Sequence, residues 1–355
     1  MTAALYAVVP EGVDDLSRPS GGNVYDRRAL HGLAALGWSV AELSVPGSWP
    51  RPEHADLLEL DTLLVGIPAG SVVLVDGLVA SGAAAVLPRY ARRLRLVVLV
   101  HMPLGPDRGE QLVLSSATAV VTTSDWSRER LRAWYGLRGV HVAVPGTDPP
   151  GSRAPRAHAG GGTSLLCVAA VHPGKGHDLL LEALAALGDR AWTLTCVGSL
   201  EIDPPHVCAV QTQVYARSWE RRVTFTGPLA GGSLAAAYEE ADLVVLSSRS
   251  ESYGMVVAEA LAHGVPVVAT AVGGVPEALG GGPAGALPGL LVPAEDPAAL
   301  TGALRAWLDD PGLRERLALA ADRRRPSVRR WPETVADLDD VLRRVTACDP
   351  VGVRR

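Results

Sequence analysis

The chain has 355 residues, which is too long for one ordinary core and about right for two domains of roughly 150 residues each. It carries 33 Lys and Arg against 38 Asp and Glu, so it is mildly acidic and we expect no nucleic-acid partner. No stretch reaches the roughly 18 consecutive apolar residues that span a bilayer, and no signal-peptide pattern opens the chain. We therefore expect a cytoplasmic protein without a transmembrane segment.

Two residue types are informative through their scarcity. Lys175 is the only lysine, although arginine is abundant, which favours a site that needs a compact point charge; chance survival on the surface is the alternative. The four cysteines lie far apart without CxxC spacing, so we expect neither a zinc site nor a disulfide framework. Cys167 and Cys196 lie in apolar runs and are predicted to be buried thiols.

Short apolar runs typical of buried strands alternate with stretches of helical spacing along most of the chain. In the first half the expected strands are 5–9, 40–45, 72–75, 96–100 and 119–122, with a helix over 24–36. In the second half they are 164–169, 192–197, 223–226, 243–246, 265–269 and 289–292. Strands separated by helices predict parallel sheets covered on both faces, so the fold class is α/β with two doubly wound domains.

The domain boundaries follow from a change in composition. Residues 149–162 are rich in Pro, Gly, Ala and Arg, which is typical of a linker. We expect a first domain over 1–150, a linker over 151–163 and a second domain over 164–328. The remaining 329–355 contain an amphipathic segment, which is either a helix that crosses back to the first domain or a solvated helix on the second. The arginines of 323–330 fit a peripheral contact with a membrane or an anionic acceptor, or simply a solvated face.

Ligands of open α/β sheets bind at loops that follow the carboxyl ends of strands, and four such loops are unusual here. The first contains Gly21 and Gly22, directly before the helix expected at 24–36. Two residues without side chains let backbone N–H groups approach a phosphate, and a helix N-terminus favours its charge. An ordinary turn is the alternative.

The second loop runs from His172 to His177 and places Lys175 between two glycines at a strand-to-helix turn, with the helix expected from about Asp178. A cation in this position suits a diphosphate, although the GxxxxGK[ST] spacing of a P-loop is absent. A surface loop is the competing interpretation, and it is weakened by the uniqueness of the lysine.

The third loop, from Glu251 to Glu259, is the strongest signal. Gly254 lies where a helix is expected to begin, so backbone N–H groups around it can meet an anion. The two glutamates offer carboxylates to vicinal hydroxyls of a sugar and a ribose. Taken singly, either glutamate also fits a residue that complements the helix dipole or lies on a solvated face.

The fourth loop begins with His101 at the end of an apolar strand, where an imidazole can hydrogen-bond a hydroxyl of a donor or an acceptor. A lone histidine at a strand end is more often structural, and only the other three loops favour the functional interpretation. Asp76 has a similar position with weaker support.

Two further patterns exclude other chemistry. No GxGxxG fingerprint follows the first strand, which argues against a nicotinamide-dependent dehydrogenase. Asp337, Leu338 and Asp339 spell DxD, a metal-binding pattern in other transferases, but they fall on the final helix and are expected on its solvated face. We predict no metal site and no cofactor.

The segment from Glu251 to Glu259 resembles the EX7E motif of the retaining GT-B glycosyltransferases, in particular glycosyltransferase family 4. The surrounding run, ADLVVLSSRSESYGMVVAEALAHGVPVVATAVGGVPE over 241–277, is similar to that family throughout. The similarity is clear over 164–310 and fainter at Gly21, Gly22, His101 and the PGTD of 145–148. It implies the GT-B fold, in which two Rossmann-like domains face a central cleft.

The resemblance also implies a retaining, metal-independent transfer from a nucleotide-diphosphate sugar to a hydroxyl acceptor. Lys175 would meet the diphosphate, Glu251 the transferred sugar and Glu259 the ribose. His101 would approach the sugar, so that it forms the expected catalytic set with Lys175 and Glu251. Donor contacts of the backbone would come from Gly21 and Gly22, which close over the phosphates, and from Ser252, Tyr253, Gly254, Met255 and Val256.

One position departs from the family's pattern. The arginine of GR-x4-KG is replaced here by Ala170, so a second cation for the diphosphate is missing, and Arg249, Arg27 and His172 are candidate substitutes. Two other functions stay open. One is a non-hydrolysing nucleotide-sugar epimerase, which shares the architecture, and the other is a catalytically weak partner subunit that binds a nucleotide sugar.

Overall fold

The computed structural model describes residues 3–148, 161–280 and 287–347. The chain divides into two compact units. The first comprises Met1–Asp14, Gly21–Pro145 and Trp331–Arg355, and the second comprises Asp15–Ser20 and Gly146–Arg330. Residues 151–160 of the expected linker and residues 348–355 of the expected C-terminal segment lie outside the described residues.

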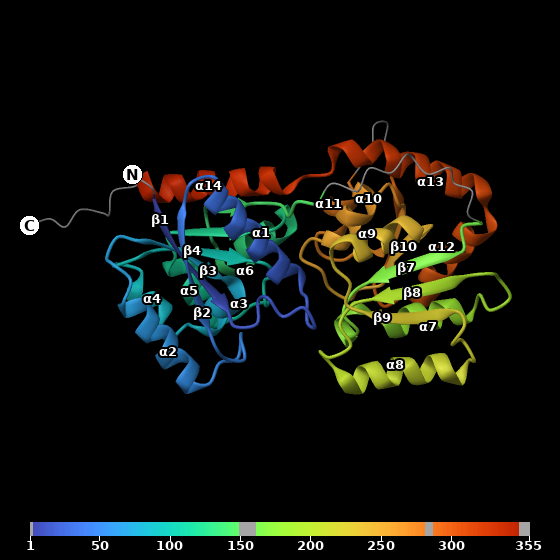
Figure 1. Ribbon diagram of the computed structural model, residues 1–355, viewed down its shortest axis with the longest axis horizontal. Helices are drawn as coiled ribbons and strands as arrows, with labels where there is room; N and C mark the ends of the chain where they lie inside the picture. Colours follow the sequence, from blue (N-terminus) through green and yellow to red (C-terminus); the bar gives the residue numbers. More distant parts are fainter. Residues whose placement is uncertain (1–2, 149–160, 281–286, 348–355) are drawn as a thin grey trace, which may run out of the picture. The chain divides into compact units, whose positions relative to one another are not determined.

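The first unit is built on a six-stranded parallel sheet in the order β2-β1-β3-β4-β5-β6 (Figure 1). Its strands are β1 (Ala4–Pro10), β2 (Ser39–Val45), β3 (Val72–Asp76), β4 (Arg95–Val100), β5 (Ala119–Thr122) and β6 (Val140–Val142). Its helices are α1 (Gly21–Ala35), α2 (His54–Val65), α3 (Gly77–Gly82), α4 (Leu87–Tyr90), α5 (Arg108–Ser116), α6 (Asp125–Tyr135) and α14 (Trp331–Ala347). The five predicted strands are confirmed within one residue at each end. Strand β6 was not predicted, because three residues are too few to show a pattern.

The second unit contains another six-stranded parallel sheet, in the order β12-β11-β10-β7-β8-β9. Its strands are β7 (Ser164–Val168), β8 (Thr193–Val197), β9 (Val223–Gly227), β10 (Leu243–Leu246), β11 (Val267–Thr270) and β12 (Gly289–Val292). Its helices are η1 (Pro173–Lys175), α7 (His177–Ala185), α8 (Pro204–Ala216), α9 (Gly231–Glu240), α10 (Met255–Ala262), α11 (Val275–Leu279), α12 (Pro297–Asp309), α13 (Pro311–Arg324) and η3 (Arg325–Ser327). The six predicted strands are confirmed within two residues at each end.

Both sheets reverse their strand order beside their first strand. In the first unit β1 pairs with β2 on one side and with β3 on the other, and in the second β7 lies between β8 and β10. Successive strands therefore proceed outwards in opposite directions from these points. In doubly wound folds, ligands bind at the carboxyl ends of the strands next to such a reversal. The predicted α/β class is confirmed, and the fold indicates where sites belong.

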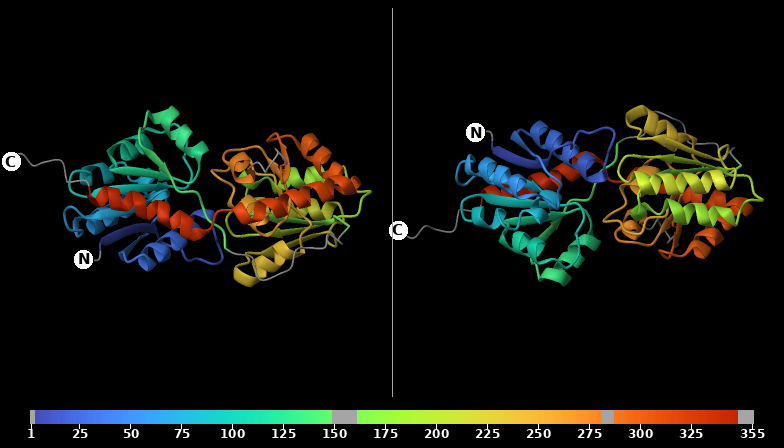
Figure 2. Two further views of the ribbon diagram at one scale, coloured as in Figure 1. Left: turned by 90° about the horizontal axis from the view of Figure 1, so that it is seen from above. Right: turned by 90° about the horizontal axis from the view of Figure 1, so that it is seen from below.

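Alternating residues of the strands form a buried apolar cluster on one face of the second sheet. Leu165 and Cys167 of β7 and Leu194 and Cys196 of β8 join one buried cluster with residues of α7, α8 and α12. Figure 2 shows α7 and α8 side by side in this unit. Both cysteines are buried and unpaired, as predicted. Among the described residues no helix combines the length and apolarity needed to cross a bilayer.

Helix α14 packs along α1 in the first unit (Figure 1). It buries one stripe at helical spacing, formed by Trp331, Thr334, Val335, Leu338, Val341, Leu342 and Val345. Asp339 accepts a hydrogen bond of 2.7 Å from the indole Nε1 of Trp38. The prediction that the DxD lies on a solvated face is therefore wrong for Asp339, because a buried donor needs an acceptor and this carboxylate supplies it.

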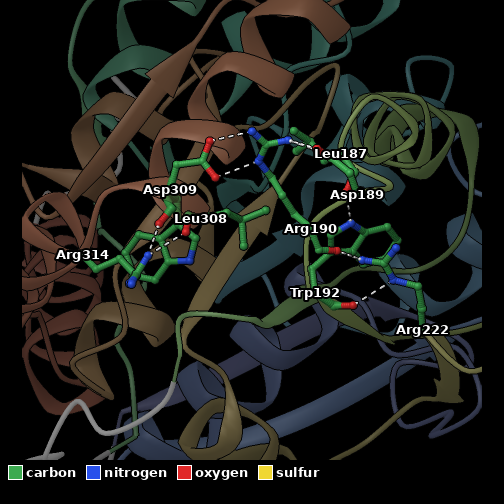
Figure 3. Close-up of polar contacts among 9 residues, drawn as sticks. Leu187, Asp189, Arg190, Trp192, Arg222, Leu308, Asp309 and Arg314 are labelled. Carbon is green, nitrogen blue, oxygen red and sulfur yellow. Dashed lines mark hydrogen bonds and ion pairs between the residues drawn. The ribbon is translucent and has the colours of Figure 1, made fainter.

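Arginine forks stabilise the amino end of β8 in the second unit (Figure 3). The Nε and Nη2 atoms of Arg190 donate to the carboxylate of Asp309, at the end of α12, over 2.7 and 2.8 Å. The guanidinium of Arg222 lies 3.6 Å from the ring centroid of Trp192 and donates to that residue's carbonyl over 3.1 Å. These contacts use a planar, bidentate or stacked cation, which a lysine does not replace.

The arginines of the basic segment before α14 are also used within the fold. Arg324 donates to the carbonyl of Ser327 over 2.8 Å, and Arg330 donates to the carbonyl of Asp148 over 2.7 Å. These guanidinium groups hydrogen-bond backbone carbonyls near the end of the second unit and stabilise its last turns.

We predict that Gly32→Ala destabilises the first unit. A Cβ at Gly32, in α1, would lie 2.3 Å from Cγ2 of Val335 on α14, and such overpacking costs about 1–3 kcal/mol. Calorimetry of thermal unfolding measures the change. Relief by a second substitution, Val335→Ala, would assign the effect to this contact.

Gly302 provides the matched control. It lies in α12, and no described atom is within 4 Å of a Cβ added there, so Gly302→Ala should stabilise the protein by about 0.5–1 kcal/mol through helix propensity. Equal behaviour of the two glycine variants would contradict the close packing of α1 on α14.

Candidate functional site

Lys175 and Glu251 meet at the strand reversal of the second sheet. Lys175 follows β7 and Glu251 follows β10, and these two strands are neighbours in the sheet. The Nζ of Lys175 donates to Oε1 of Glu251 over 2.6 Å, although 76 positions separate them in sequence. The hydroxyl of Ser248 donates to the same oxygen over 2.8 Å. The structure thus brings together two of the predicted site residues and orients the glutamate from two sides.

Glycine makes this approach of the two loops sterically feasible. Gly176 follows Lys175 in the left-handed region, with φ of +66°, and a Cβ there would lie 2.1 Å from the carbonyl oxygen of Ser247. The Ser247 hydroxyl in turn donates to the carbonyl of Gly176 over 2.8 Å. Lys175 ends the short helix η1, and α7 begins at His177, one residue before the predicted position.

The loop after β11, which the sequence did not indicate as part of the site, packs against the backbone of Glu251 and Ser252. A Cβ on Gly273 would lie 1.5 Å from the carbonyl oxygen of Glu251, and one on Gly274 would lie 2.4 Å from that of Ser252. The loop after β11 therefore packs directly on the backbone of the motif. A Gly-Gly pair after a strand was the available signal, the same one that indicated Gly21 and Gly22.

The turn between the two glutamates presents backbone rather than side chains. Gly254 precedes α10 with φ of +91°, and Met255 and Val256, both partly exposed, open the helix. The Tyr253 side chain is buried, and burial raises the pKa of its phenol to about 12. Tyr253 and Gly254 thus shape the turn, and the N–H groups of the first turn of α10 are the groups suited to an anion.

Glu259 has a partner of its own. The hydroxyl of Tyr238, on α9, donates to its Oε2 over 2.6 Å. Burial raises the pKa of the Glu259 carboxyl, and the hydrogen bond from Tyr238 opposes that rise. Glu259 is therefore held in place independently of the pair formed by Lys175 and Glu251.

Arg249, a candidate substitute for the arginine missing at Ala170, is engaged by acids. Its Nη1 and Nη2 donate to Asp178 over 2.9 and 2.8 Å, and its Nε donates to Glu295 over 2.5 Å. Its backbone N–H also donates to the carbonyl of Gly174 over 2.9 Å. Arg249 thus braces the loop that carries Lys175.

The other two candidate substitutes are engaged as well. In the first unit Arg27 donates to Asp14 over 2.7 Å and to Glu42 over 2.8 Å. Burial, and then the charge of Lys175, lower the pKa of His172, which is therefore neutral near pH 7. Lys175 accordingly remains the cation best suited to a diphosphate, since its ammonium has three donors and Glu251 takes one.

Gly21 and Gly22 occupy the first two positions of α1 in the first unit, rather than a turn before the helix. The prediction that the helix begins at 24 is wrong, because glycine tolerates the first turn, where N–H groups have no intrahelical partner. A Cβ on Gly22 would lie 3.2 Å from Cδ2 of His101, so the small residue also makes room for this ring.

His101 is not a lone histidine. Its Nε2 lies 2.8 Å from Oδ1 of Asp26, on α1, and 3.4 Å from Oδ2 of Asp76, at the end of β3. Both carboxylates are only 4% exposed. Asp76 also caps α3, because its Oδ1 accepts the N–H groups of Leu78 and Val79. The sequence did not indicate Asp26, because its inward direction depends on the exact phase of α1.

Electrostatics couple these three groups. Burial, followed by the negative charge of Asp26, raises the pKa of Asp76 to about 6. Burial lowers the pKa of His101, but Asp26 and Asp76 raise it by more, so the net shift is upward. Among the described residues this is the one group of three whose potential ligand atoms all lie within 4.8 Å of one another. A hydrogen bond joins His101 to Asp26 and an ion-pair contact joins it to Asp76, so we interpret the group as a proton-sharing cluster.

Known proteins are similar to this chain in sequence and in fold. Residues 162–310 match the family model of the group 1 glycosyl transferases. D-inositol 3-phosphate glycosyltransferases of Kineococcus radiotolerans and Xylanimonas cellulosilytica are 34% and 33% identical over 264 and 269 residues, or 68% and 71% of this chain. Those alignments cover 60% and 63% of the relatives, so the chain spans about three fifths of the length of the curated relatives it matches.

Solved structures extend the similarity to the whole chain. A sucrose-phosphate synthase from Thermosynechococcus elongatus has a TM-score of 0.79 and 21% identity and covers 98% of this chain and 100% of its own. Anabaena HepE in complex with UDP-glucose has a TM-score of 0.76 and 17% identity and covers 96% and 99%. The GT-B fold is thereby confirmed. The second unit carries a group 1 glycosyltransferase domain, and the predicted relationship to the GT-B glycosyltransferases is confirmed with it.

We predict that Asp76→Asn flattens the pH dependence of the first unit's stability. The pKa of Asp76 is raised from 3.8 to about 6 on folding and that of His101 is also raised, so the native state binds more protons than the unfolded chain between these values. Stability should therefore fall as pH rises from about 4 through 6 and further through the folded pKa of His101.

Urea unfolding at pH values from about 4 to about 8 measures this slope. Glu59→Gln, which changes an exposed carboxylate on α2, controls for the loss of a negative charge. A slope in Asp76→Asn equal to that of the unmodified protein would contradict the buried, perturbed state of Asp76.

Proposed function

We propose that this chain is a retaining, metal-independent glycosyltransferase that moves a sugar from a nucleotide-diphosphate donor to a hydroxyl acceptor. The observation that carries the proposal is the pair of Lys175 and Glu251, at the strand reversal where doubly wound folds bind ligands. The names of the relatives record glycosyl transfer, and HepE was solved with UDP and with UDP-glucose. Both support a nucleotide-sugar donor.

The charges of the second unit fit a sugar diphosphate. Lys175 neutralises the diphosphate with the ammonium donors that Glu251 leaves unused. Glu251, oriented by Lys175 and Ser248, accepts hydrogen bonds from hydroxyls of the transferred sugar. Glu259, oriented by Tyr238, accepts hydrogen bonds from the ribose hydroxyls.

Backbone N–H groups complete the anion site in this proposal. The first turn of α10, from Met255, offers N–H groups of a helix N-terminus to the diphosphate, as does the first turn of α1 at Gly21 and Gly22. Their partial positive charge adds to that of Lys175 and supplements the cation lost at Ala170.

The chemistry that follows is a front-face substitution. The bond from C1 of the sugar to the diphosphate oxygen breaks, C1 becomes oxocarbenium-like, and Lys175 with the helix N-termini stabilises the leaving charge. The diphosphate accepts the proton of the incoming hydroxyl as the new bond forms on the same face. In this proposal His101 hydrogen-bonds the transferred sugar. Exclusion of water from the bound donor prevents its hydrolysis.

A donor and acceptor screen tests the proposed function. Thermal shifts with UDP-, GDP-, ADP- and TDP-sugars identify a donor, because a ligand that binds only the folded state raises its stability. That donor is then incubated with hydroxyl acceptors, including inositol phosphates, with and without EDTA. Transfer in EDTA supports the proposal, and loss that Mg²⁺ or Mn²⁺ restores refutes metal independence.

The same screen separates the two alternative functions. An isomerised donor without transfer would identify an epimerase. Binding of the donor without turnover would identify a weak partner subunit, a function that Ala170 and the acid-paired Arg249 favour.

We predict that Lys175→Ala loses turnover by roughly 10²-fold or more, because the leaving diphosphate loses its main cation. Steady-state kinetics with the identified donor measures the loss. Arg221→Ala removes an exposed cation from the same unit and should leave kcat unchanged. Near-normal turnover of Lys175→Ala would refute the assigned role.

We also predict that the product keeps the anomeric configuration of the donor. Lys175, Glu251 and Glu259 all belong to the donor side, whereas inversion needs a base behind C1 that activates the acceptor. His101 is the one candidate base that we identify in the first unit, and its Nε2 is bonded to Asp26. NMR of the anomeric proton coupling, with a gluco-configured donor, distinguishes the outcomes, and an inverted linkage would overturn the mechanism.

A further inference from the structure

Two buried carboxylates converge on one imidazole nitrogen in the first unit. Asp26 on α1, Asp76 at the end of β3 and His101 after β4 meet beside the strand reversal of the first sheet. Oδ2 of Asp26 is buried, and no described residue hydrogen-bonds to it. Burying two carboxylates is unfavourable unless a cation compensates for them, and the His101 ring is the group in contact with both.

The ring of His101 is also fixed in orientation. Tyr25 contacts it edge-on with ring centroids 5.1 Å apart, and the hydroxyl of Tyr25 donates to the carbonyl of Ala143 over 2.8 Å. Gly22 leaves little further room beside the ring, because a Cβ there would lie 3.2 Å from its Cδ2 atom. With Nε2 on the carboxylates, Nδ1 is the remaining polar atom, and no hydrogen bond joins it to any residue that the structure describes.

We propose that Asp26 and Asp76 are positioning residues that hold His101 as an imidazolium, with Nε2–H on the carboxylates and Nδ1–H directed to an oxygen of the bound donor. This assignment rests on the proposed function. Of the two acids, Asp26 is the stronger partner, because its oxygen is 2.8 Å from Nε2 and that of Asp76 is 3.4 Å away. The imidazolium is a charged hydrogen-bond donor, and at this place it stabilises negative charge on the leaving group or orients the sugar.

The charges around the ring support the imidazolium. Asp26 faces it from α1 and Asp76 from β3, while the Tyr25 hydroxyl is bonded to Ala143 and Thr123 contributes only a neutral hydroxyl to the His101 carbonyl. No arginine or lysine among the described residues is ion-paired with Asp26 or Asp76. The two carboxylates raise the pKa of His101 above its usual value despite burial.

The unmodified protein allows the first test. NMR of the imidazole nitrogens, with His101 assigned by comparison with His101→Gln, reports which nitrogen carries the proton of the neutral ring. The measurement is made at a pH above the pKa of His101. We expect the Nε2–H tautomer, since the carboxylates accept from that nitrogen. The Nδ1–H tautomer would overturn the proposal, and this result depends on no donor or acceptor.

Asp26→Asn supplies the second test. The Asn oxygen still accepts from Nε2–H but carries no charge, so the pKa of His101 should fall by about one unit and the imidazolium fraction at mildly alkaline pH should fall about tenfold. The alkaline limb of the profile of kcat against pH should move down by the same amount, with KM for the donor little changed. Asp76→Asn should produce a smaller shift, and it serves as the second variant if Asp26→Asn does not fold.

Asp61→Asn is the matched control. It alters a carboxylate on α2 that accepts a hydrogen bond from Tyr90, and it should change neither the pKa of His101 nor the pH profile of kcat. An unchanged His101 pKa in both Asp26→Asn and Asp76→Asn would overturn the proposal. A lowered pKa with an unmoved pH profile would overturn the contact with the donor. Absence of transfer by the unmodified protein would refute the proposed function instead, while the tautomer and the pKa of His101 would still test the cluster.

Discussion

The parallel direction of every strand pairing is the constraint on which the rest of this structure depends. Parallel strands end at one edge of their sheet, so residues that follow different strands are brought together there. The reversal of strand order selects which loops become neighbours. It joins the loops of Lys175 and Glu251 in one unit, and those of Asp76 and His101 with the first helix in the other.

Close backbone contact keeps the motif loops in position. Gly176 and Gly273 adopt positive φ against carbonyl oxygens of neighbouring loops, and Gly274 packs equally tightly at an ordinary φ. Side chains at these positions would displace the backbone around Glu251. Hydrogen bonds of Ser247 and Ser248 complete this arrangement, so Glu251 is oriented by the protein itself, without a ligand.

The arginines and the lysine of the second unit have different roles for a physical reason. Arginines such as Arg190, Arg222 and Arg249 make planar, bidentate or stacked contacts that hold loops and helix ends. The single ammonium, Lys175, occupies a narrow turn between glycines, where a compact charge with rotatable donors fits. Because Ala170 lacks a charge and Arg249 is paired with Asp178, the proposed diphosphate site depends on Lys175 for its cationic side chain.

The sequence by itself determined the α/β class, eleven of the twelve strands to within two residues, and the loops that carry Gly21, Lys175, Glu251 and His101. Strand length and apolar periodicity are local properties, and so is the presence of glycine at a turn. The short strand β6 and the start of α1 escaped because they leave no periodic signal. The EX7E-like spacing of the two glutamates is likewise a property of the sequence alone.

Only the tertiary structure decided which of these residues share partners. The pairing of Lys175 with Glu251 spans 76 positions, and Asp26 meets His101 only because α1 turns that side chain towards the sheet. Tertiary packing also showed that Asp339 anchors a helix through Trp38 and that Gly273 supports the motif backbone. Such contacts depend on the phase of helices and on the order of strands, which local patterns do not encode.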